Sequence, residues 1–153
     1  MSYRMAGERD IPVLCQLRKR QLMDEGIDPN IDIDEELYRF FADKLADGSL
    51  VQWLLEKDGA VIATAAILFL ELPPTFTNRT GGRGYITNMY TAPEHRGKGI
   101  AVRMLEKLMD EARQRSVPTI ILKASGSGRP VYKKFGFSEA GDWMELVLSG
   151  ESL

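Results

Sequence analysis

The sequence predicts a mixed α/β domain in which a central sheet of parallel and antiparallel strands is flanked by about four helices. Hydrophobic residues make up 44% and charged residues 27% of the 153 residues, which is typical of one globular domain spanning 1–153. The predicted elements run helix, helix, hairpin, strand, helix, strand, helix and a last strand pair. Because two helices and a hairpin come first, this order disfavours a doubly wound parallel sheet.

The chain is predicted to begin with two amphipathic helices. Asp10 is a suitable N-cap for the first, which should end around Gly26, and Asp34 can cap the second, which should end before Gly48. Their apolar positions, spaced near the helical period, are Ile11, Leu14, Leu17 and Leu22 in the first helix and Leu37, Phe40, Phe41 and Leu45 in the second.

Two β-rich runs, residues 51–57 and 60–70, follow the helices. Asp58-Gly59 between them is a strong hairpin signal, so the two runs should pair antiparallel. Pro73 and Pro74 stop the second run, and the Thr- and Gly-rich stretch up to residue 84 should be a loop. The next strand is predicted over residues 85–91.

A long amphipathic helix starts near residue 100 and should end before Pro118. A short buried strand is expected over 119–123, a short helix over 128–135, and a final strand pair formed by Phe137 and residues 143–148. The unit from 85 to 123 should be a right-handed parallel crossover. The apolar face of the long helix consists of Ile100, Met104, Leu105, Leu108, Met109 and Ala112.

Composition and charge exclude several classes of function. The net charge of −2 arises from mixed acidic and basic residues, so neither nucleic acid nor a membrane surface is expected as a partner. The most apolar run, residues 61–70, is about half of the roughly 20 residues that span a bilayer, and the N-terminus lacks the apolar core of a secretory signal. The single cysteine, Cys15, provides no disulfide or metal framework. We therefore expect a cytoplasmic protein without a metal.

The segment Arg96-Gly97-Lys98-Gly99-Ile100-Ala101 has the features of a phosphate-binding loop. It lies between a predicted strand and a predicted helix, where free backbone N–H groups and the helix dipole favour an anion. The two glycines let a pyrophosphate approach the backbone, while Arg96 and Lys98 add local positive charge. A dinucleotide fingerprint would need a third glycine where the chain has Val102, and no P-loop motif occurs.

Two motifs give the chain a family resemblance. Arg96-x-x-Gly99-x-Ala101 is similar to the R/Q-x-x-G-x-G/A motif of the GNAT superfamily of N-acetyltransferases, and the segment from Tyr132 to Phe137 resembles the family's Y-x-K-x-G-F signature. The helix-helix-hairpin order upstream is also similar. The resemblance implies the GNAT acyl-CoA N-acyltransferase fold, acetyl-CoA as cosubstrate, and transfer of the acetyl group to an amine by direct attack in a ternary complex.

The resemblance also implies which residues act. Tyr132 would be the general acid that protonates the departing CoA thiolate. Backbone groups of the strand before the loop would bind pantetheine, and the loop would bind pyrophosphate. The implied cofactor-binding residues are Met89, Tyr90, Thr91, Arg96, Gly97, Lys98, Gly99, Ile100 and Ala101, together with Ser125 where many members have asparagine.

No carboxylate occurs between residues 85 and 91, where some protein-acetylating members carry a general base. A water held by Asn88 or Thr87, or Glu71, can take that role, and the sequence leaves the choice open. His95 is interpreted as an exposed residue and Cys15 as a small core residue. The aromatic residues that can line an acceptor pocket, although strand aromatics are more often core, are Trp53, Phe69, Phe76 and Tyr85.

The acceptor is expected to be the amine of a small molecule or of a protein. Seven acidic residues and no basic residue occur from Asp24 to Glu36, which indicates either a solvated connection or a surface that attracts a cationic amine. Homodimers are common in the family, but no residue predicts one here. Two alternatives stay open, namely a non-catalytic acyl-CoA sensor and a protein-interaction module.

Overall fold

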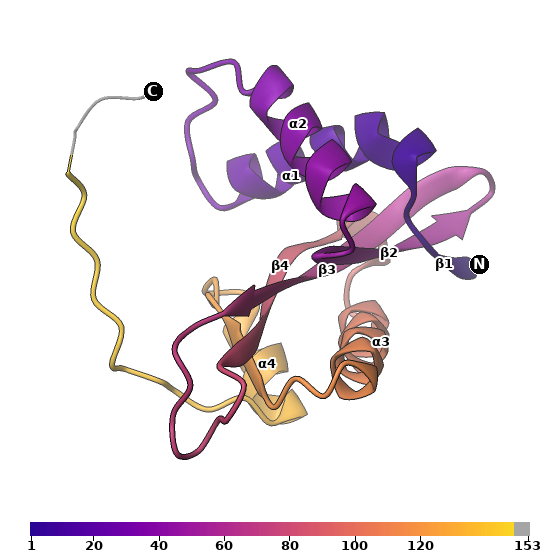
Figure 1. Cartoon of the computed structure of the whole chain (residues 1–153). Coiled ribbons are helices and arrows are strands. Elements are labelled where there is room, and N and C mark those ends of the chain that lie inside the picture. The colour runs from indigo at the N-terminus through magenta and orange to yellow at the C-terminus, as the bar shows by residue number, and fades with distance from the viewer. Residues whose placement is uncertain (149–153) are drawn as a thin grey trace.

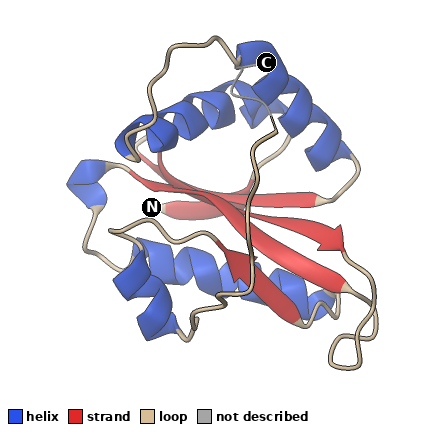
Figure 2. Cartoon of the chain, turned by 90° about the vertical axis from the view of Figure 1, so that its left-hand side faces the viewer, coloured by secondary structure: helices blue, strands red, loops and turns tan. Residues whose placement is uncertain are grey.

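The computed structural model describes residues 1–148 and consists of one mixed sheet covered by helices on both faces (Figures 1 and 2). α1 and α2 lie on one face of the sheet, and α3 and α4 lie on the other. The helices are α1 (Ile11–Asp24), α2 (Asp34–Ala46), α3 (Ile100–Gln114) and α4 (Arg129–Phe135), with short 3-10 turns at Glu8–Asp10 and Pro93–His95. The strands are β1 (Ser2–Met5), β2 (Leu50–Lys57), β3 (Ala60–Glu71), β4 (Gly82–Thr91) and β5 (Thr119–Leu122).

The strands are neighbours in the order β1-β2-β3-β4-β5, and only the β4–β5 pair is parallel. The predicted hairpin joins β2 and β3, where Asp58 and Gly59 both have positive φ, as a two-residue hairpin turn with the twist of the strands requires. β4, α3 and β5 form the predicted parallel strand–helix–strand unit. The predicted mixed sheet and four helices are therefore confirmed.

Hydrophobic residues fill the space on both faces of the sheet. All six residues predicted for the apolar face of α3 are buried, and they pack against the side of the sheet that includes Leu55, Ile67 and Ile86. On the other face, α1 and α2 bury Leu14 and Phe41 against Leu54. Helical periodicity alone fixes the inward face of α3, which explains why this prediction succeeds.

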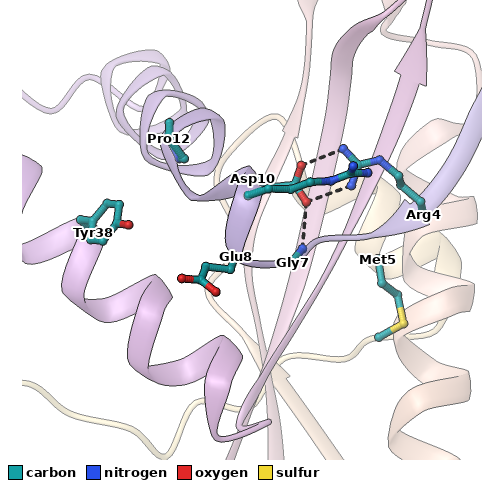
Figure 3. Close-up of a pocket in the computed structure, with 8 residues that line it drawn as sticks. Arg4, Met5, Gly7, Glu8, Asp10, Pro12 and Tyr38 are labelled. Carbon is teal, nitrogen blue, oxygen red and sulfur yellow. Dashed lines mark hydrogen bonds and ion pairs between the residues drawn. The ribbon is translucent and has the colours of Figure 1, made fainter.

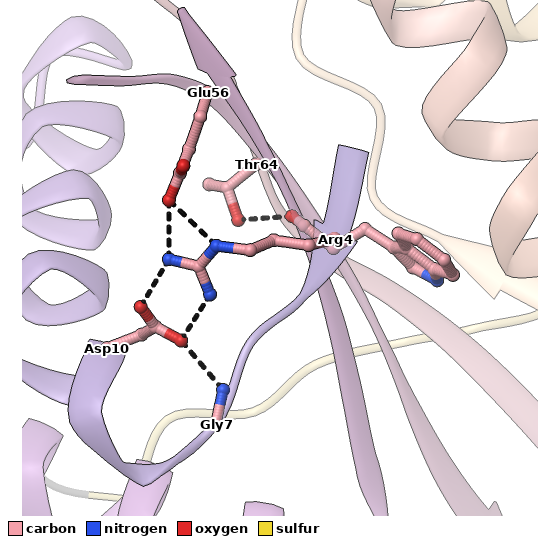
Figure 4. A network of polar contacts seen from close by, with 6 residues as sticks. Arg4, Gly7, Asp10, Glu56 and Thr64 are labelled. Atoms are coloured by element: carbon pink, nitrogen blue, oxygen red, sulfur yellow. Dashed lines mark hydrogen bonds and ion pairs between the residues drawn. The ribbon is translucent and has the colours of Figure 1, made fainter. Parts of the chain in front are cut away.

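An ion network fixes the N-terminal strand to the first helix (Figure 4). The Arg4 guanidinium donates to both carboxylate oxygens of Asp10, at 2.9 and 2.7 Å, and its Nε donates to Glu56 at 2.7 Å. Asp10 also accepts the backbone N–H of Gly7. These contacts lower the pKa of Asp10, chiefly through the hydrogen bonds from Arg4. The network thus links β1, α1 and β2.

The structure bears out the first predicted helix cap in position and corrects the second. Asp10 is the N-cap residue of α1, but its side chain binds Arg4 and Gly7 and makes no capping hydrogen bond to the helix. At the second helix, Asp32 accepts the N–H of Asp34, while the Asp34 carboxylate pairs with Lys19 of α1. Partners distant in sequence therefore determine what both aspartates do.

The predicted final strand pair is wrong for the described residues. Neither Phe137 nor residues 143–148 form a strand, and the segment after α4 runs beside the body of the molecule (Figures 1 and 2). A strand needs a neighbour for its N–H and C=O groups, and no described strand pairs with this segment. β1 was not predicted, because its four residues are too few for a clear alternating pattern.

Candidate functional site

A cleft of about 1010 Å³ lies where the ends of β4 and β5 meet α1 and the N-terminus of α3. Its walls come from five parts of the chain: the C-terminal half of α1, β4, the loop before α3, the segment after β5, and α4. Among its lining residues are Asp24, Glu25, Thr87, Met89, Tyr90, Thr91, His95, Arg96, Gly97, Gly99, Ile100, Ala101, Ser125 and Tyr132.

The cleft exists because the parallel strands β4 and β5 diverge after a short paired stretch. The β4–β5 ladder pairs Arg83 with Thr119 and ends at Ile86 with Leu122. Residues 87–91 of β4 continue beyond it, so on the β5 side their backbone has no strand neighbour in the described part of the chain. An unpaired strand edge offers alternating N–H and C=O groups to a ligand that contains amides.

A bulge in β4 lies directly beside this unpaired edge. The β3–β4 register shifts between Thr64 and Ala66, and Asn88 of β4 has a φ of 56°. The buried Asn88 amide donates to Gln52 at 3.3 Å, and Gln52 donates to the Thr64 hydroxyl at 2.8 Å. This polar network inside the sheet holds the bulge, and the bulge sets the direction of Met89 and the residues after it.

The loop before α3 has the geometry of an anion site. Gly97 and Gly99 have φ values of 77° and 79°, which residues with a Cβ rarely adopt, and a Cβ added to either would meet open space. Gly99 is the N-cap of α3 and has no side-chain cap. Within residues 1–148, the N–H groups of residues 97–99 donate to no protein atom, and the first N–H groups of α3 have no partner in a preceding turn. The helix dipole adds partial positive charge at the same point.

Arg96 connects this loop to α1. Its Nε donates to the Thr91 carbonyl at 2.9 Å, and its Nη2 pairs with Asp24 at 3.0 Å. The guanidinium also lies 5.8 Å from the centre of the Tyr90 ring. Arg96 therefore connects the loop before α3 to β4 and to α1, which form two other walls of the cleft.

Tyr132 lies on α4 and lines the cleft. Its ring packs edge-on against Phe137, and it is half-buried. Burial raises the pKa of the Tyr132 hydroxyl, and the negative charge of Glu25 on the opposite wall raises it further. The phenol is accordingly protonated at neutral pH and can donate a hydrogen bond into the cleft.

The structure brings nearly all predicted cofactor-binding residues to this cleft. Lys98 is the exception, because it is exposed and does not line the cleft. Ser125 does line it, and its hydroxyl accepts the N–H of Gly128 at 3.3 Å, so this side chain also shapes the turn before α4.

The three residues considered for the general base, Thr87, Asn88 and Glu71, lie in different places. Thr87 lines the cleft, whereas Asn88 is buried in the sheet and Glu71 is exposed at the end of β3, outside the lining. His95 lines the cleft at its loop end, and Cys15 is buried, which raises the pKa of its thiol.

Of the four aromatic residues considered for an acceptor pocket, only Tyr85 lines the cleft. Trp53 packs beneath the Lys107 ammonium, Phe69 beneath the Arg115 guanidinium, and Phe76 is fully exposed.

Sequence reasoning did not assign the α1 residues of the cleft. Arg18, Gln21 and Glu25 line it from the C-terminal half of this helix. The acidic run that begins at Asp24 is evident in the sequence, but no local pattern indicates that Asp24 and Glu25 line the same cleft as Tyr132. That placement depends on how α1 packs across the sheet.

A second hollow, between β1, α1 and α2, is structural (Figure 3). Its titratable residues include Arg4 and Asp10, and the Arg4 guanidinium donates two hydrogen bonds to the Asp10 carboxylate. Tyr38 and Glu8 lie at its margin and are exposed. Within residues 1–148, no buried side-chain N or O atom that lines this hollow lacks a hydrogen-bond partner, so its buried part offers little for a ligand to bind.

Comparison with known proteins identifies the family. The sequence model of the acetyltransferase (GNAT) family matches residues 14–137. The chain belongs to this family. As a GNAT acetyltransferase it falls in the class of acetyl-CoA-dependent N-acetyltransferases, which confirms the resemblance in the two motifs. Comparison with curated proteins gives no significant match.

Solved structures agree with this assignment. A predicted acetyltransferase from Clostridium acetobutylicum, crystallised with acetyl-CoA, is 56% identical, and the match covers 96% of each chain with a TM-score of 0.95. A GCN5-related N-acetyltransferase from Ralstonia eutropha is 26% identical over 97% of this chain and 99% of that one, with a TM-score of 0.89. Glucosamine-6-phosphate N-acetyltransferase from Arabidopsis thaliana has the same fold at 20% identity, over 97% of this chain and all of that one, with a TM-score of 0.69.

The residues of this cleft fit acetyl-CoA. The loop at Gly97 and Gly99 provides open space and free N–H groups for a pyrophosphate, and the unpaired edge of β4 provides partners for the pantetheine amides. In the described residues, no cluster of three His, Cys, Asp or Glu side chains that can hold a metal is found, and no helix is both long and apolar enough to span a membrane.

Proposed function

We propose that the chain transfers the acetyl group of acetyl-CoA to a primary amine by direct attack in a ternary complex, with Tyr132 as the general acid. The observation that carries the proposal is the parting of β4 from β5. It leaves the edge of residues 87–91 in one cleft with the glycine loop and Tyr132. This arrangement supports pyrophosphate binding at the loop, pantetheine along β4, and the thioester near Tyr132.

The reaction joins the amine nitrogen to the thioester carbonyl carbon and breaks the C–S bond. The sulfur keeps the bonding electron pair and gains a proton, the amine loses one, and the products are an amide and CoA. Holding amine and thioester in one cleft provides the larger part of the rate enhancement, because it replaces an encounter in solution.

Tyr132 contributes less than this positioning. The reference pKa values of about 8.5 for a thiol and about 10 for tyrosine make proton donation uphill by roughly 1.5 units, or about 2 kcal/mol. Burial and Glu25 raise the pKa of Tyr132, which widens that gap. Tyr132 therefore acts mainly as a hydrogen-bond donor to the developing thiolate and completes the proton transfer as the C–S bond breaks.

A kinetic comparison tests the role of Tyr132. We expect Tyr132→Phe to lower kcat by no more than the roughly 10²- to 10⁴-fold typical of general acid catalysis and to leave the Kd for acetyl-CoA unchanged. Phe keeps the packing against Phe137, so a control by circular dichroism should show the same fold. An unchanged kcat would remove Tyr132 from the mechanism.

The acceptor is a cationic amine that enters from the α1 side. Asp24 and Glu25 line that wall, and Asp24 is paired with Arg96 while no ion pair involves Glu25 within residues 1–148. A carboxylate across the cleft from the thioester attracts an ammonium group and can accept its proton before attack. A water at Thr87 is the alternative acceptor of that proton.

A panel of amines tests this acceptor class by measuring CoA release. Cationic amines should react with higher kcat/KM than neutral ones, and Glu25→Gln should raise KM for them without changing the Kd for acetyl-CoA. Glu35→Gln is the matched control, because Glu35 is exposed on α2 and does not line the cleft. Equal KM values in the two variants would contradict the proposal.

The same assays separate the two alternatives. Acetyl-CoA binding without acetylation of any amine would indicate a sensor. Absence of acetyl-CoA binding would exclude both the enzyme and the sensor and would favour a protein-interaction module.

A further inference from the structure

One basic side chain of the cleft has no acidic partner within residues 1–148. The arginine and lysine side chains that line the cleft are those of Arg18, Arg96 and Lys123. Arg96 pairs with Asp24. Lys123 lies 4.0 Å from Glu145, and its side chain is 82% exposed, so water screens its charge. No ion pair of the described residues involves Arg18, which is therefore the cation of the cleft that remains available to a ligand.

The Arg18 guanidinium also retains most of its hydrogen-bonding capacity. The side chain is half-buried in the wall of the cleft. Its one hydrogen bond to a described protein atom runs from Nη1 to Oε1 of Gln21, at 3.3 Å. A guanidinium has five N–H donors in a planar fork, and a carboxylate accepts two of them side by side. Arg18 can therefore bind a carboxylate of a ligand.

Gln21 separates Arg18 from an acidic residue of the same wall. The Gln21 amide oxygen accepts from Arg18, and its nitrogen donates to Oε1 of Glu25 at 3.4 Å. These two hydrogen bonds and the amide between them place Nη1 of Arg18 and Oε1 of Glu25 at most about 9 Å apart. Because Glu25 has no ion pair within residues 1–148 either, the wall presents one positive and one negative group to the cleft.

The position of Arg18 along α1 separates it from the loop proposed for pyrophosphate. Residues 18, 21 and 25 lie three and four positions apart, so they share one side of the helix, and all three line the cleft. Asp24, at the end of α1, pairs with Arg96 of the loop. Arg18 lies six residues earlier, about 9 Å along the helix axis. The acceptor is therefore the substrate placed to meet Arg18.

We propose that the acceptor is an amine that also carries a carboxylate, with its ammonium group at Glu25 and its carboxylate at Arg18. This acceptor class rests on the acetyl transfer proposed above and narrows its substrate. Glu25 and Tyr132 line the same cleft, so an amine held at Glu25 lies on the side where the thioester is proposed. The carboxylate takes no part in the bond changes and fixes the other end of the acceptor.

The spacing and the charge of the two groups select among such molecules. The Gln21 amide fills the space between Arg18 and Glu25, so the acceptor has to run past it. An α-amino acid, which carries both charged groups on one carbon atom, is too short for this path, whereas a flexible chain such as that of 6-aminohexanoate is long enough. A carboxylate fits better than a phosphate dianion, because Arg18 supplies one positive charge and Glu25 repels a second negative one.

A matched pair of amines tests the proposal. 6-Aminohexanoate and 6-aminohexanamide have the same length and the same amine, and they differ in the charge of the far end. In the wild type, CoA release should give a kcat/KM roughly 10- to 100-fold higher for the carboxylate, through KM, as expected for hydrogen bonds to a charged group. Arg18→Gln should abolish this preference by raising KM for 6-aminohexanoate. Arg18→Lys, which keeps the charge without the fork, should retain part of it.

Binding measurements distinguish this proposal from the proposed acetyl transfer. With CoA in place of acetyl-CoA no transfer occurs, and calorimetry should still give a Kd for 6-aminohexanoate at least tenfold lower than for 6-aminohexanamide. Arg20→Gln is the matched control and should match the wild type, because Arg20 is exposed on the same helix and does not line the cleft. Binding of 6-aminohexanoate that is lost in Arg18→Gln, without acetylation of any amine, would support the carboxylate site and contradict the transfer.

Three results would overturn the proposal. The first is equal affinity of the wild type for the two amines. The second is a preference for the carboxylate that survives Arg18→Gln. The third is a weaker Kd for acetyl-CoA in Arg18→Gln than in the wild type, which would assign Arg18 to the cofactor.

Discussion

Two glycines in the loop before α3 adopt a backbone conformation that few other residues can share. Gly97 and Gly99 have positive φ, their backbone N–H groups donate to no protein atom within residues 1–148, and the space a Cβ would fill is open. A side chain at either position would both strain the loop and occupy the region proposed for pyrophosphate.

We expect Gly99→Ala to weaken acetyl-CoA binding at least tenfold, measured by calorimetry. The left-handed conformation costs about 1–2 kcal/mol for alanine. Gly59→Ala is the control, because Gly59 has nearly the same φ, 77°, and lies in the β2–β3 hairpin, away from the cleft. Both variants should lose similar stability, and equal Kd values for acetyl-CoA would argue against a pyrophosphate site at the loop.

Gly128 controls the position of Tyr132. A Cβ at Gly128 would lie 2.9 Å from Cε2 of Tyr132 and 3.2 Å from the Ser125 hydroxyl oxygen, so the ring would have to move. Gly128→Ala should lower kcat about tenfold or more, within the range expected of general acid catalysis, and keep most acetyl-CoA affinity. Gly141→Ala, where a Cβ meets nothing within 4 Å and which does not line the cleft, should behave like the wild type. Steady-state kinetics distinguishes them, and two equally active variants would contradict this role.

At the scale of elements, the attachment of β1 to α1 depends on a charged pair that is mostly shielded from water. Asp10 is 6% exposed and is held by Arg4, which also binds Glu56 on β2. The pKa of Asp10 is lowered in the folded chain, so its carboxylate stabilises the fold above its ordinary pKa of about 3.9. This stabilisation disappears as the pH falls through the lower pKa of the folded state.

Asp10→Asn should therefore lower the free energy of unfolding at pH 7 by about 1.5–3 kcal/mol, the range for hydrogen bonds to charged groups. The difference from the wild type should begin to shrink below about pH 4, where Asp10 of the unfolded chain takes up a proton, and it should be lost as the pH falls through the lower pKa of the folded state. Urea unfolding across pH measures it. Asp110→Asn, an exposed residue on α3 paired with Arg113, should have little effect at any pH, and a pH-independent loss in Asp10→Asn would show that charge is not the cause.

The elements that sequence alone predicted are those that local pattern determines. The inward face of α3, the Asp58-Gly59 turn and the glycine loop each depend on a few neighbouring residues. The missed features depend on distant partners. β1 exists because it pairs with β2, and Glu25 reaches the cleft because α1 packs across the sheet.

The same distinction explains the error at the C-terminus. Residues 143–148 have the composition of a strand, so the sequence predicts one, but no strand of the described chain pairs with them. A motif predicts Tyr132 as the general acid, whereas the higher pKa of its hydroxyl follows from burial and from Glu25, which only the folded chain brings near.

At the scale of the whole molecule, the cleft joins parts of the chain that are far apart in sequence. α1, β4, the loop before α3 and α4 each contribute one wall. A ligand that contacts all of them binds only the folded state, so binding should stabilise the whole domain.

Acetyl-CoA at 100 times its Kd should raise the unfolding free energy by about 2.7 kcal/mol. For a chain of this size, that corresponds to an increase in Tm of roughly 5–10 °C. Differential scanning fluorimetry measures the shift, and adenosine, which lacks the pyrophosphate, serves as the control. The absence of a shift at millimolar acetyl-CoA would contradict the proposed binding mode.

The burial of Cys15 has a practical consequence for measuring turnover. It is the only cysteine in the sequence, it lies in the core between α1 and the sheet, and burial raises the pKa of its thiol. Thiol reagents react with thiolates that they can reach, and the folded protein exposes none. CoA liberated by acetyl transfer would then be the only fast-reacting thiol in the cuvette, so a colorimetric thiol reagent can follow the wild-type enzyme continuously without replacing a cysteine.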